Sequence, residues 1–266
     1  MILFSELERW RGNTITRSFP KAIVPDRHWR RPSTKESEES LTRVQNIIGD
    51  FDAEYTMKYY DYWSQHYEKD LEILDYKVPD FMASKLAGFL PGREWENPSH
   101  SVLDVGAGTG QMAIALKKFD FKGTVDALDG NTKMLEKARE KGLYKHLEQH
   151  LLMDDSPMKF ASNTYDTVVC CCAMVPALIQ PECLPDMVRV AKSGGRLYFT
   201  TRATDGNSTF RDRVDVQLNA MKESGLIRIT AEDVIPQYSW PVNEGDDDKH
   251  CISAVAICLE KLKNSE

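Results

Sequence analysis

The chain has 266 residues, of which 41% are hydrophobic and 28% are charged, and its formal net charge is −7. This length fits one large domain or two small ones and is ample for a buried core. The acidic balance argues against a nucleic-acid binder, which needs a concentrated basic face, and no apolar run approaches the roughly 18 residues of a membrane-spanning helix.

Residues 1–40 show no sustained hydrophobic period and contain several arginines and prolines. This composition predicts a disordered leader. An organelle import signal is the alternative, and the early acids Glu6 and Glu8 argue against it. We therefore expect the folded part of the chain to begin near residue 41.

A helical pattern dense in aromatic residues follows over residues 41–95. Tyr55, Tyr59 and Trp63 fall at helical spacings, which place their rings on neighbouring turns. Most of these rings are expected to pack against the main domain. We predict an N-terminal helical cap, followed by a loop over residues 90–100 that proline and glycine interrupt.

Strand and helix patterns alternate from residue 96 to the end of the chain. Alternating elements with short connections predict a doubly wound α/β fold. The predicted strand at residues 165–174 is apolar at every position from Val168 onward, which is typical of a central parallel strand covered on both faces. The predicted strands span residues 102–105, 124–129, 147–153, 165–174, 195–202, 226–240 and 252–261, and the predicted helices span residues 111–119, 132–141, 181–192 and 211–224.

The last two predicted strands have no long helix between them, which indicates an antiparallel addition to the sheet. We therefore predict that residues 96–266 form a Rossmann-like domain. Its seven-stranded sheet is expected to be mostly parallel, with an antiparallel edge strand. We expect the protein to be a monomer.

Three of the six cysteines, Cys170 to Cys172, are consecutive within the apolar strand predicted at residues 165–174. Consecutive strand residues point to opposite faces, which suits neither a disulfide framework nor a C-x-x-C metal site. We expect reduced thiols and no metal. A reducing compartment such as the cytoplasm follows from this, with the nucleus or an organelle as alternatives.

Three glycines follow the first strand of the alternating region in the segment SVLDVGAGTG, residues 101–110. Glycine at 106 and 108 lets the backbone approach a ligand closely, and the helix start beyond it favours negative groups. A dinucleotide fingerprint, G-x-G-x-x-G, needs its third glycine where Gln111 stands, and this argues against an NAD-dependent dehydrogenase.

Acidic residues follow the next two strands. Asp129 ends the second strand, where a carboxylate can accept hydrogen bonds from both hydroxyls of a ribose. Asp154 and Asp155 follow the third strand, where one of them can accept a hydrogen bond from an adenine amine. A polar turn is the alternative for that pair.

Four segments of residues 101–202 resemble, in order, successive blocks of the class I S-adenosylmethionine-dependent methyltransferases. They read VLDVGAGTG, ALDGNTKMLEKAR, MDDSPM with NTYDTVV, and VRVAKSGGRLYFTTR. The upstream segment YYDYWSQHYEKDLEILDYKVP and the helix segment LEKAREKGLY are similar to the small methyltransferase-like members of this family. The resemblance extends from about residue 40 to the end and implies S-adenosylmethionine as the cofactor.

The resemblance also implies roles for residues around the methionine and ribose of the cofactor. Asp104 is expected near the methionine amino group, directly or through water. Gly106, Ala107 and Gly108 would let the backbone pass under the methionine and ribose. Asp129 would hold the ribose hydroxyls.

Further roles are implied at the adenine and at the methyl group. Cys171 or Cys172 would line the methyl-transfer channel, and Tyr67 would close over the cofactor with Trp63 behind it. Gly110 is expected to serve helix–strand packing. The residues expected at the adenine are Gly130, Met134, Asp154 and Asp155.

The acceptor is constrained by two segments. Methyltransferases acting on base amines or glutamine amides usually carry an Asn/Asp-Pro-Pro-Tyr-like loop after the fourth strand. Residues 172–176 read CAMVP instead, which argues against an acceptor of this class. The acidic segment at residues 243–250 would attract a cationic acceptor, with a solvated hairpin loop as the alternative. An enclosed pocket under the cap favours a small molecule over a protein side chain.

No catalytic residue is assigned, because a sulfonium methyl needs mainly alignment with its acceptor, and no histidine is paired with a carboxylate in the sequence. A methyltransferase is therefore the predicted function. The alternative is a non-catalytic module that binds S-adenosylmethionine or S-adenosylhomocysteine.

Overall fold

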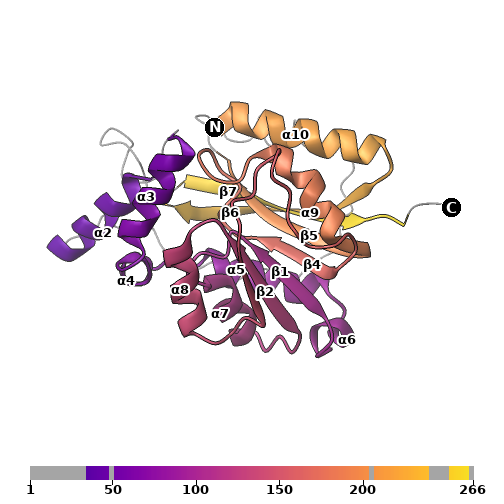
Figure 1. Cartoon of the computed structure of the whole chain (residues 1–266), viewed down its shortest axis with the longest axis horizontal. Helices are drawn as coiled ribbons and strands as arrows, with labels where there is room; N and C mark the ends of the chain where they lie inside the picture. Colours follow the sequence, from indigo (N-terminus) through magenta and orange to yellow (C-terminus); the bar gives the residue numbers. More distant parts are fainter. Residues whose placement is uncertain (1–33, 48–50, 204–206, 240–251, 264–266) are drawn as a thin grey trace.

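The computed structural model describes residues 34–47, 51–203, 207–239 and 252–263. Within these residues a seven-stranded sheet forms the centre of the protein, and a group of helices lies beyond one end of it (Figure 1). Residues 1–33 of the leader predicted over residues 1–40, and the acidic segment at 243–250, lie outside the described residues. None of the described helices is both long and apolar enough to cross a membrane.

The strand order is β3-β2-β1-β4-β5-β7-β6, in which the first five strands run parallel. Strand β7 is antiparallel to both β5 and β6, and it lies one place in from the edge. The predicted Rossmann-like, mostly parallel sheet is confirmed. The strands are β1 Ser101–Val105, β2 Thr124–Asp129, β3 His146–Gln149, β4 Tyr165–Cys170, β5 Ala191–Arg202, β6 Ile227–Ser239 and β7 Ile252–Lys261.

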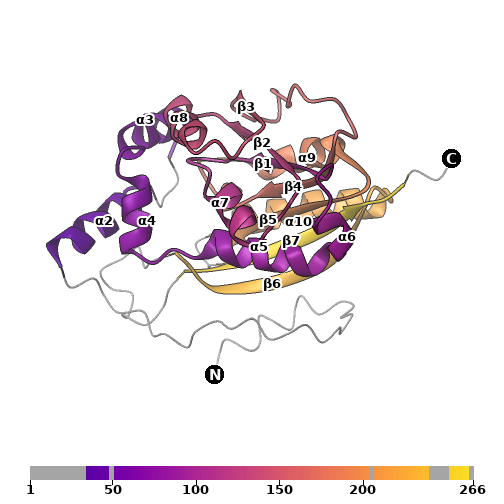
Figure 2. The ribbon, with the colours of Figure 1, turned by 90° about the horizontal axis from the view of Figure 1, so that it is seen from below.

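Helices cover both faces of the sheet, and consecutive residues of the central strands enter different cores. Val168 and Cys170 pack with α9 and α10, whereas Val169 between them packs with α5 and α7 (Figure 2). This explains why β4 is apolar over Val168–Cys170, where side chains enter both cores. The bounds are α5 Val78–Phe89, α7 Gln111–Lys118, α8 Thr132–Glu140, α9 Leu184–Val190 after a 3-10 turn at Pro181–Cys183, and α10 Ser208–Glu223.

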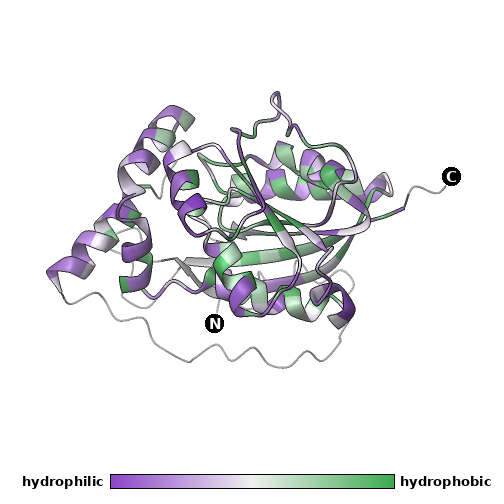
Figure 3. Ribbon diagram, turned by 60° about the horizontal axis from the view of Figure 1, so that its bottom comes forward, coloured by the Kyte–Doolittle hydropathy of each residue, from purple (hydrophilic) through white to green (hydrophobic). Residues whose placement is uncertain are grey.

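The cap consists of α2 (Lys35–Gln45), α3 (Ala53–Trp63) and α4 (Tyr67–Ile73). Its helices contain more hydrophilic residues than the central strands (Figure 3). Helix α2 begins at Lys35, earlier than the expected start at residue 41, because Thr34 caps its first turn. The segment predicted as a loop at 90–100 also contains a short helix, α6 (Gly92–Trp95).

One buried carboxylate joins the three helices of the cap. Asp70 of α4 is fully buried and accepts hydrogen bonds from Arg43 Nε at 2.6 Å, Trp63 Nε1 at 2.7 Å and Ser40 Oγ at 2.8 Å. Burial alone would raise the pKa of Asp70, but these hydrogen bonds outweigh it and hold the pKa below its ordinary value. The cap is therefore organised around an ion pair as well as around apolar contacts.

Two predicted strands end earlier than expected. Strand β3 ends at Gln149 and β4 at Cys170, several residues before the predicted ends at 153 and 174. Cys172 has φ +63°, which turns the chain out of the strand, and the Sγ atoms of Cys171 and Cys172 lie 3.4 Å apart. The expectation that all three consecutive cysteines alternate between faces is therefore wrong, because only Cys170 belongs to the strand.

Candidate functional site

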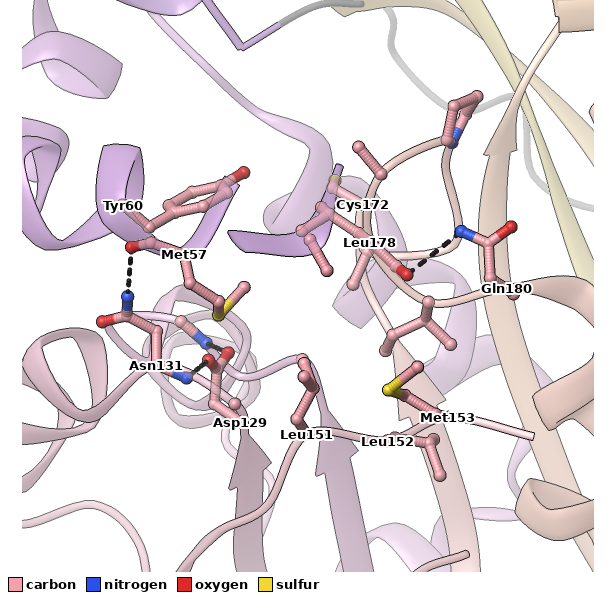
Figure 4. Close-up of a pocket in the computed structure, with 18 of the residues that line it drawn as sticks. Met57, Tyr60, Asp129, Asn131, Leu151, Leu152, Met153, Cys172, Leu178 and Gln180 are labelled. Atoms are coloured by element: carbon pink, nitrogen blue, oxygen red, sulfur yellow. Dashed lines mark hydrogen bonds between the residues drawn. The ribbon is translucent and has the colours of Figure 1, made fainter. Parts of the chain in front are cut away.

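A cavity of about 870 Å³ lies where the parallel strands end, as expected for an open α/β sheet. Gly106 follows β1, Asp129 ends β2, Cys171 follows β4 and Arg202 ends β5, and all four line it. Helix α3 of the cap covers one side, with Tyr60 above the strand ends (Figure 4). Segments far apart in the sequence thus enclose one space.

The glycine turn after β1 brings the backbone up against neighbouring segments. The N–H groups of Gly106 and Ala107 donate to Leu128 O at 2.8 and 3.1 Å. Gly106 has φ +73°, and a Cβ at this position would lie 2.4 Å from the Cβ of Ala173. A side chain here is therefore excluded both by the backbone conformation and by the loop that faces it.

Asp129 is held rigidly at the end of β2. Its Oδ2 accepts from Gly108 N at 2.7 Å, and its Oδ1 accepts from Asn131 N at 2.8 Å. Burial raises the pKa of Asp129, and the two backbone N–H groups oppose this rise. Each oxygen keeps capacity for a further hydrogen bond, because a carboxylate oxygen can accept two.

Asn131 connects this acid to the cap. Its side-chain oxygen accepts from Met134 N at 2.9 Å and thereby caps α8, while its amide nitrogen donates to Met57 O at 3.1 Å (Figure 4). The same nitrogen donates to Asp61 Oδ1 at 2.9 Å. One side chain therefore fixes both the start of α8 and the position of α3 over the cavity.

Asp104, near the end of β1, is buried without lining the cavity. Its Oδ2 accepts from the Tyr144 hydroxyl at 2.6 Å, while its Oδ1 has no hydrogen-bond partner. Burial raises the pKa of Asp104 to about 7; the hydrogen bond from Tyr144 opposes this rise, and the negative charge of Asp129 adds to it. A buried oxygen without a partner is costly, and this makes Asp104 a candidate partner for a bound cation.

Eight of the eleven residues expected at the cofactor line the cavity. Asp104 and Ala107 do not, because the first is buried against Tyr144 and the second packs into a small core with Ala127. Asp155 is exposed and lies outside the lining. The eight lining residues are Tyr67, Gly106, Gly108, Asp129, Gly130, Met134, Asp154 and Cys171.

Several lining residues were not singled out from the sequence as cavity residues. Tyr60 belongs to the aromatic stripe that was expected to serve packing, and burial raises its pKa and that of Tyr67. Trp63 lies behind Tyr67, with ring centroids 4.7 Å apart, as expected. Arg202, at the end of β5, and Asn207, immediately before α10, carried no sequence signal beyond that of a polar residue at the end of an element. Other unassigned lining residues are Met57, Asn131, Leu151, Leu152, Met153, Leu178, Ile179 and Phe210.

The strand order, the glycine turn and the acid at the end of β2 define a Rossmann-like α/β protein with a nucleotide-type cavity. A family model described as "Methyltransferase domain" matches residues 102–195. Human methyltransferase-like protein 27 is 30% identical over 190 residues, which are 71% of this chain and 74% of that protein. The chain therefore belongs to the class I S-adenosylmethionine-dependent methyltransferases.

Other similarities are more distant. The ubiquinone/menaquinone biosynthesis C-methyltransferase UbiE of Burkholderia multivorans is 34% identical over 102 residues, 38% of this chain and 42% of that protein.

Two solved structures share the fold. The structure of the Haloferax volcanii Trm112 methyltransferase activator with a putative methyltransferase matches with a TM-score of 0.54 at 16% identity, covering 78% of this chain and 97% of that chain. The [4+2]-cyclase SpnF matches with a TM-score of 0.50 at 16% identity, covering 69% and 81%. At this identity the two structures show the fold alone.

Proposed function

We propose that the protein transfers a methyl group from S-adenosylmethionine to a small-molecule acceptor. The observation that carries this proposal is the anchored carboxylate of Asp129, which faces the same cavity as the glycine turn and the end of β4. The unpartnered Oδ1 of Asp104 and the tight approach at Gly106 also fit the cofactor. The cap up to residue 95 and the domain from residue 96 would then act as two functional units.

Different residues of the site would contact different parts of the proposed cofactor. Asp129 would accept hydrogen bonds from the ribose hydroxyls, and Gly106 and Gly108 would lie under the methionine and ribose. Gly130 and Met134 would flank the adenine, with Asp154 at its edge. Asp104 would act on the methionine amino group by charge, directly or through water.

The cofactor supplies an activated methyl group on a sulfonium, so the protein mainly has to align the acceptor and exclude water. Cys171 and Ala173 after β4 would line the path of transfer, and Tyr60 and Tyr67 of the cap would close it. Such positioning supplies on the order of 7–11 kcal/mol in favourable cases. We assign no general base, because His150, the one histidine among the described residues of the lining, is engaged with Ser156 O at 2.9 Å.

The proposal is tested by calorimetry with S-adenosylmethionine and NAD, and by incubation of the protein with methyl-labelled cofactor and cell extract. We expect the protein to bind S-adenosylmethionine and not NAD. We also expect the labelled methyl group to appear in a small-molecule fraction. Cofactor binding without label in any fraction would support a non-catalytic binding module instead.

Replacing Asp129 with alanine is expected to weaken S-adenosylmethionine binding by about 100-fold or more. Hydrogen bonds to a charged group contribute about 1.5–3 kcal/mol each, and the ribose would lose two of them. Asp155→Ala is the matched control, since this neighbouring acid lies outside the cavity, and it should leave the calorimetric Kd unchanged. Equal affinity of both variants would contradict the assignment of Asp129.

The affinity for S-adenosylhomocysteine is expected to rise as the pH increases from about 5.5 to 7. The pKa of Asp104 is about 7, so its carboxylate becomes negative over this range and favours the ligand's ammonium. Calorimetry on the wild type and on Asp104→Asn measures this, and the variant should lack the rise.

Ionisation of Asp104 is expected to favour ligand binding but to lower the stability of the ligand-free protein. Because burial raises its pKa, ionisation destabilises the fold between about pH 4 and pH 7. The ligand-free Asp104→Asn variant should therefore have a Tm at pH 8 no lower than that of the wild type. A large fall in Tm would indicate that Asp104 is a structural residue.

A further inference from the structure

Arg202 lies on the far side of the cavity from the proposed ribose position. It ends β5, and the strand order β2-β1-β4-β5 separates it by two strands from the glycine turn and by three from Asp129. Neighbouring strands are about 4.8 Å apart, so this separation is roughly 10–15 Å. Arg202 therefore faces the part of the cavity beyond the methyl-transfer position, on the acceptor side.

The guanidinium of Arg202 has no anionic partner among the residues that the structure describes. Its Nε is buried without a hydrogen bond, and it forms no ion pair with any residue that the structure describes. The second arginine of the lining, Arg213, differs because it donates to Glu182 Oε1 at 3.0 Å and to Gln180 Oε1 at 3.2 Å. A buried cationic donor without a partner is costly, and a bound anion would remove that cost.

Asn207 provides a complementary group beside this arginine. Its side chain is only 4% exposed, and its amide nitrogen donates to the backbone oxygen of Arg202 at 2.8 Å. This contact fixes the orientation of the amide, and its Oδ1 is left buried without a partner in the cavity lining. The two residues therefore offer an unsatisfied cationic donor and an unsatisfied neutral acceptor next to each other.

We propose that Arg202 and Asn207 form the acceptor subsite, and that the methyl acceptor is a small carboxylic acid with a neighbouring hydroxyl or amino group. This inference rests on the proposed methyltransferase function. The guanidinium binds the carboxylate, and Asn207 Oδ1 accepts a hydrogen bond from the hydroxyl or amino group. One unpaired positive charge matches one carboxylate, whereas a phosphate dianion would bring an uncompensated negative charge into the cavity.

This proposal gives the acceptor a negative charge, whereas the acidic segment at residues 243–250 indicated a cationic acceptor. That segment lies outside the described residues, whereas Arg202 and Asn207 line the cavity itself. Apolar residues, among them Leu178 and Phe210, also line the cavity. An acid with an apolar group therefore suits the subsite better than a fully polar one.

The test uses the full chain saturated with S-adenosylhomocysteine and ligand-observed NMR. The probes are mandelate and leucine, and mandelamide and leucinamide are their counterparts without the carboxylate. We expect at least one acid to bind tenfold or more tightly than its amide. Arg202→Gln should abolish this preference, Arg202→Lys should keep part of it, and Arg213→Gln, the matched control, should retain it.

Three outcomes would overturn the proposal. The first is that the wild type binds neither acid more tightly than the corresponding amide, or binds none of the four probes. The second is a preference that survives in Arg202→Gln. The third is an Arg202→Gln variant that binds S-adenosylhomocysteine tenfold more weakly but binds decarboxylated S-adenosylmethionine normally, since Arg202 would then hold the cofactor's own carboxylate. Failure of the proposed function is distinct, because the wild type would then either not bind S-adenosylhomocysteine or transfer no label in the incubation with methyl-labelled cofactor.

Discussion

Gly106→Ala is expected to weaken S-adenosylmethionine binding by at least about 100-fold, which corresponds to about 2.8 kcal/mol. The new Cβ would lie 2.4 Å from Ala173 Cβ and 3.3 Å from Ile179 Cδ1, so the turn and the facing loop cannot both keep their positions. Both segments line the cavity, and their separation changes its shape where the cofactor is proposed to bind. Calorimetry on the purified variant measures the loss.

The control must separate cavity closure from backbone strain, because Gly106 has φ +73° and alanine is strained at such an angle. Gly142 has φ +61°, no atom lies within 4 Å of an added Cβ, and it does not line the cavity. Gly142→Ala should lower the Tm in the same manner but leave the Kd unchanged. A folded Gly106→Ala variant with wild-type affinity would show that this turn does not hold the cofactor.

Asp70→Ala is expected to destabilise the cap by about 3–5 kcal/mol, the usual effect of breaking a buried ion pair by removing one partner. Arg43, Trp63 and Ser40 would each lose their acceptor inside the cap. Chemical denaturation measures the free energy of unfolding, and hydrogen exchange shows whether α2–α4 open before the sheet. Because α3 covers the cavity, affinity for S-adenosylmethionine should fall as well.

An exposed ion pair in the same cap provides the control for Asp70. Lys69 pairs with Glu36 at the surface, and Lys69→Ala should give no measurable change. The pH dependence has a definite sign: the pKa of Asp70 is held below 3.8, so its stabilisation is complete above that pH and is lost as the pH falls below it. A wild-type unfolding free energy for Asp70→Ala would exclude this role.

The elements that the sequence predicted well are those whose signal is local. The strand–turn–helix unit from β1 to α7 and the continuous apolar run of β4 were recognised because strand and helix periods differ over a few residues. The ends of β3 and β4 were placed too late. Their apolar residues continue past the last strand pairing, into segments that line the cavity instead.

Site residues that lie on the glycine turn or at the strand tips were predicted, because the topology of a parallel sheet places strand ends together. Tyr60 is one of the aromatic rings of the cap, most of which were expected only to pack. Its role over the cavity depends on the approach of α3 to the strand ends, which Asn131 fixes by contacts to Met57 and Asp61. Such contacts between distant segments leave no periodic signal in the sequence.

The sequence by itself determined the sheet, the glycine turn and the family, since these depend on short-range patterns and on motifs with fixed spacing. Only the tertiary structure decided which acids face the cavity and which are buried beside it, as Asp129 and Asp104 illustrate. It also brought Arg202 and Asn207 into the cavity lining, where Arg202 Nε and Asn207 Oδ1 are buried without a hydrogen-bond partner among the described residues. The physical reason is that packing between segments decides which side chains are buried and which find hydrogen-bond partners. The sequence pattern of one segment does not indicate which other segments pack against it.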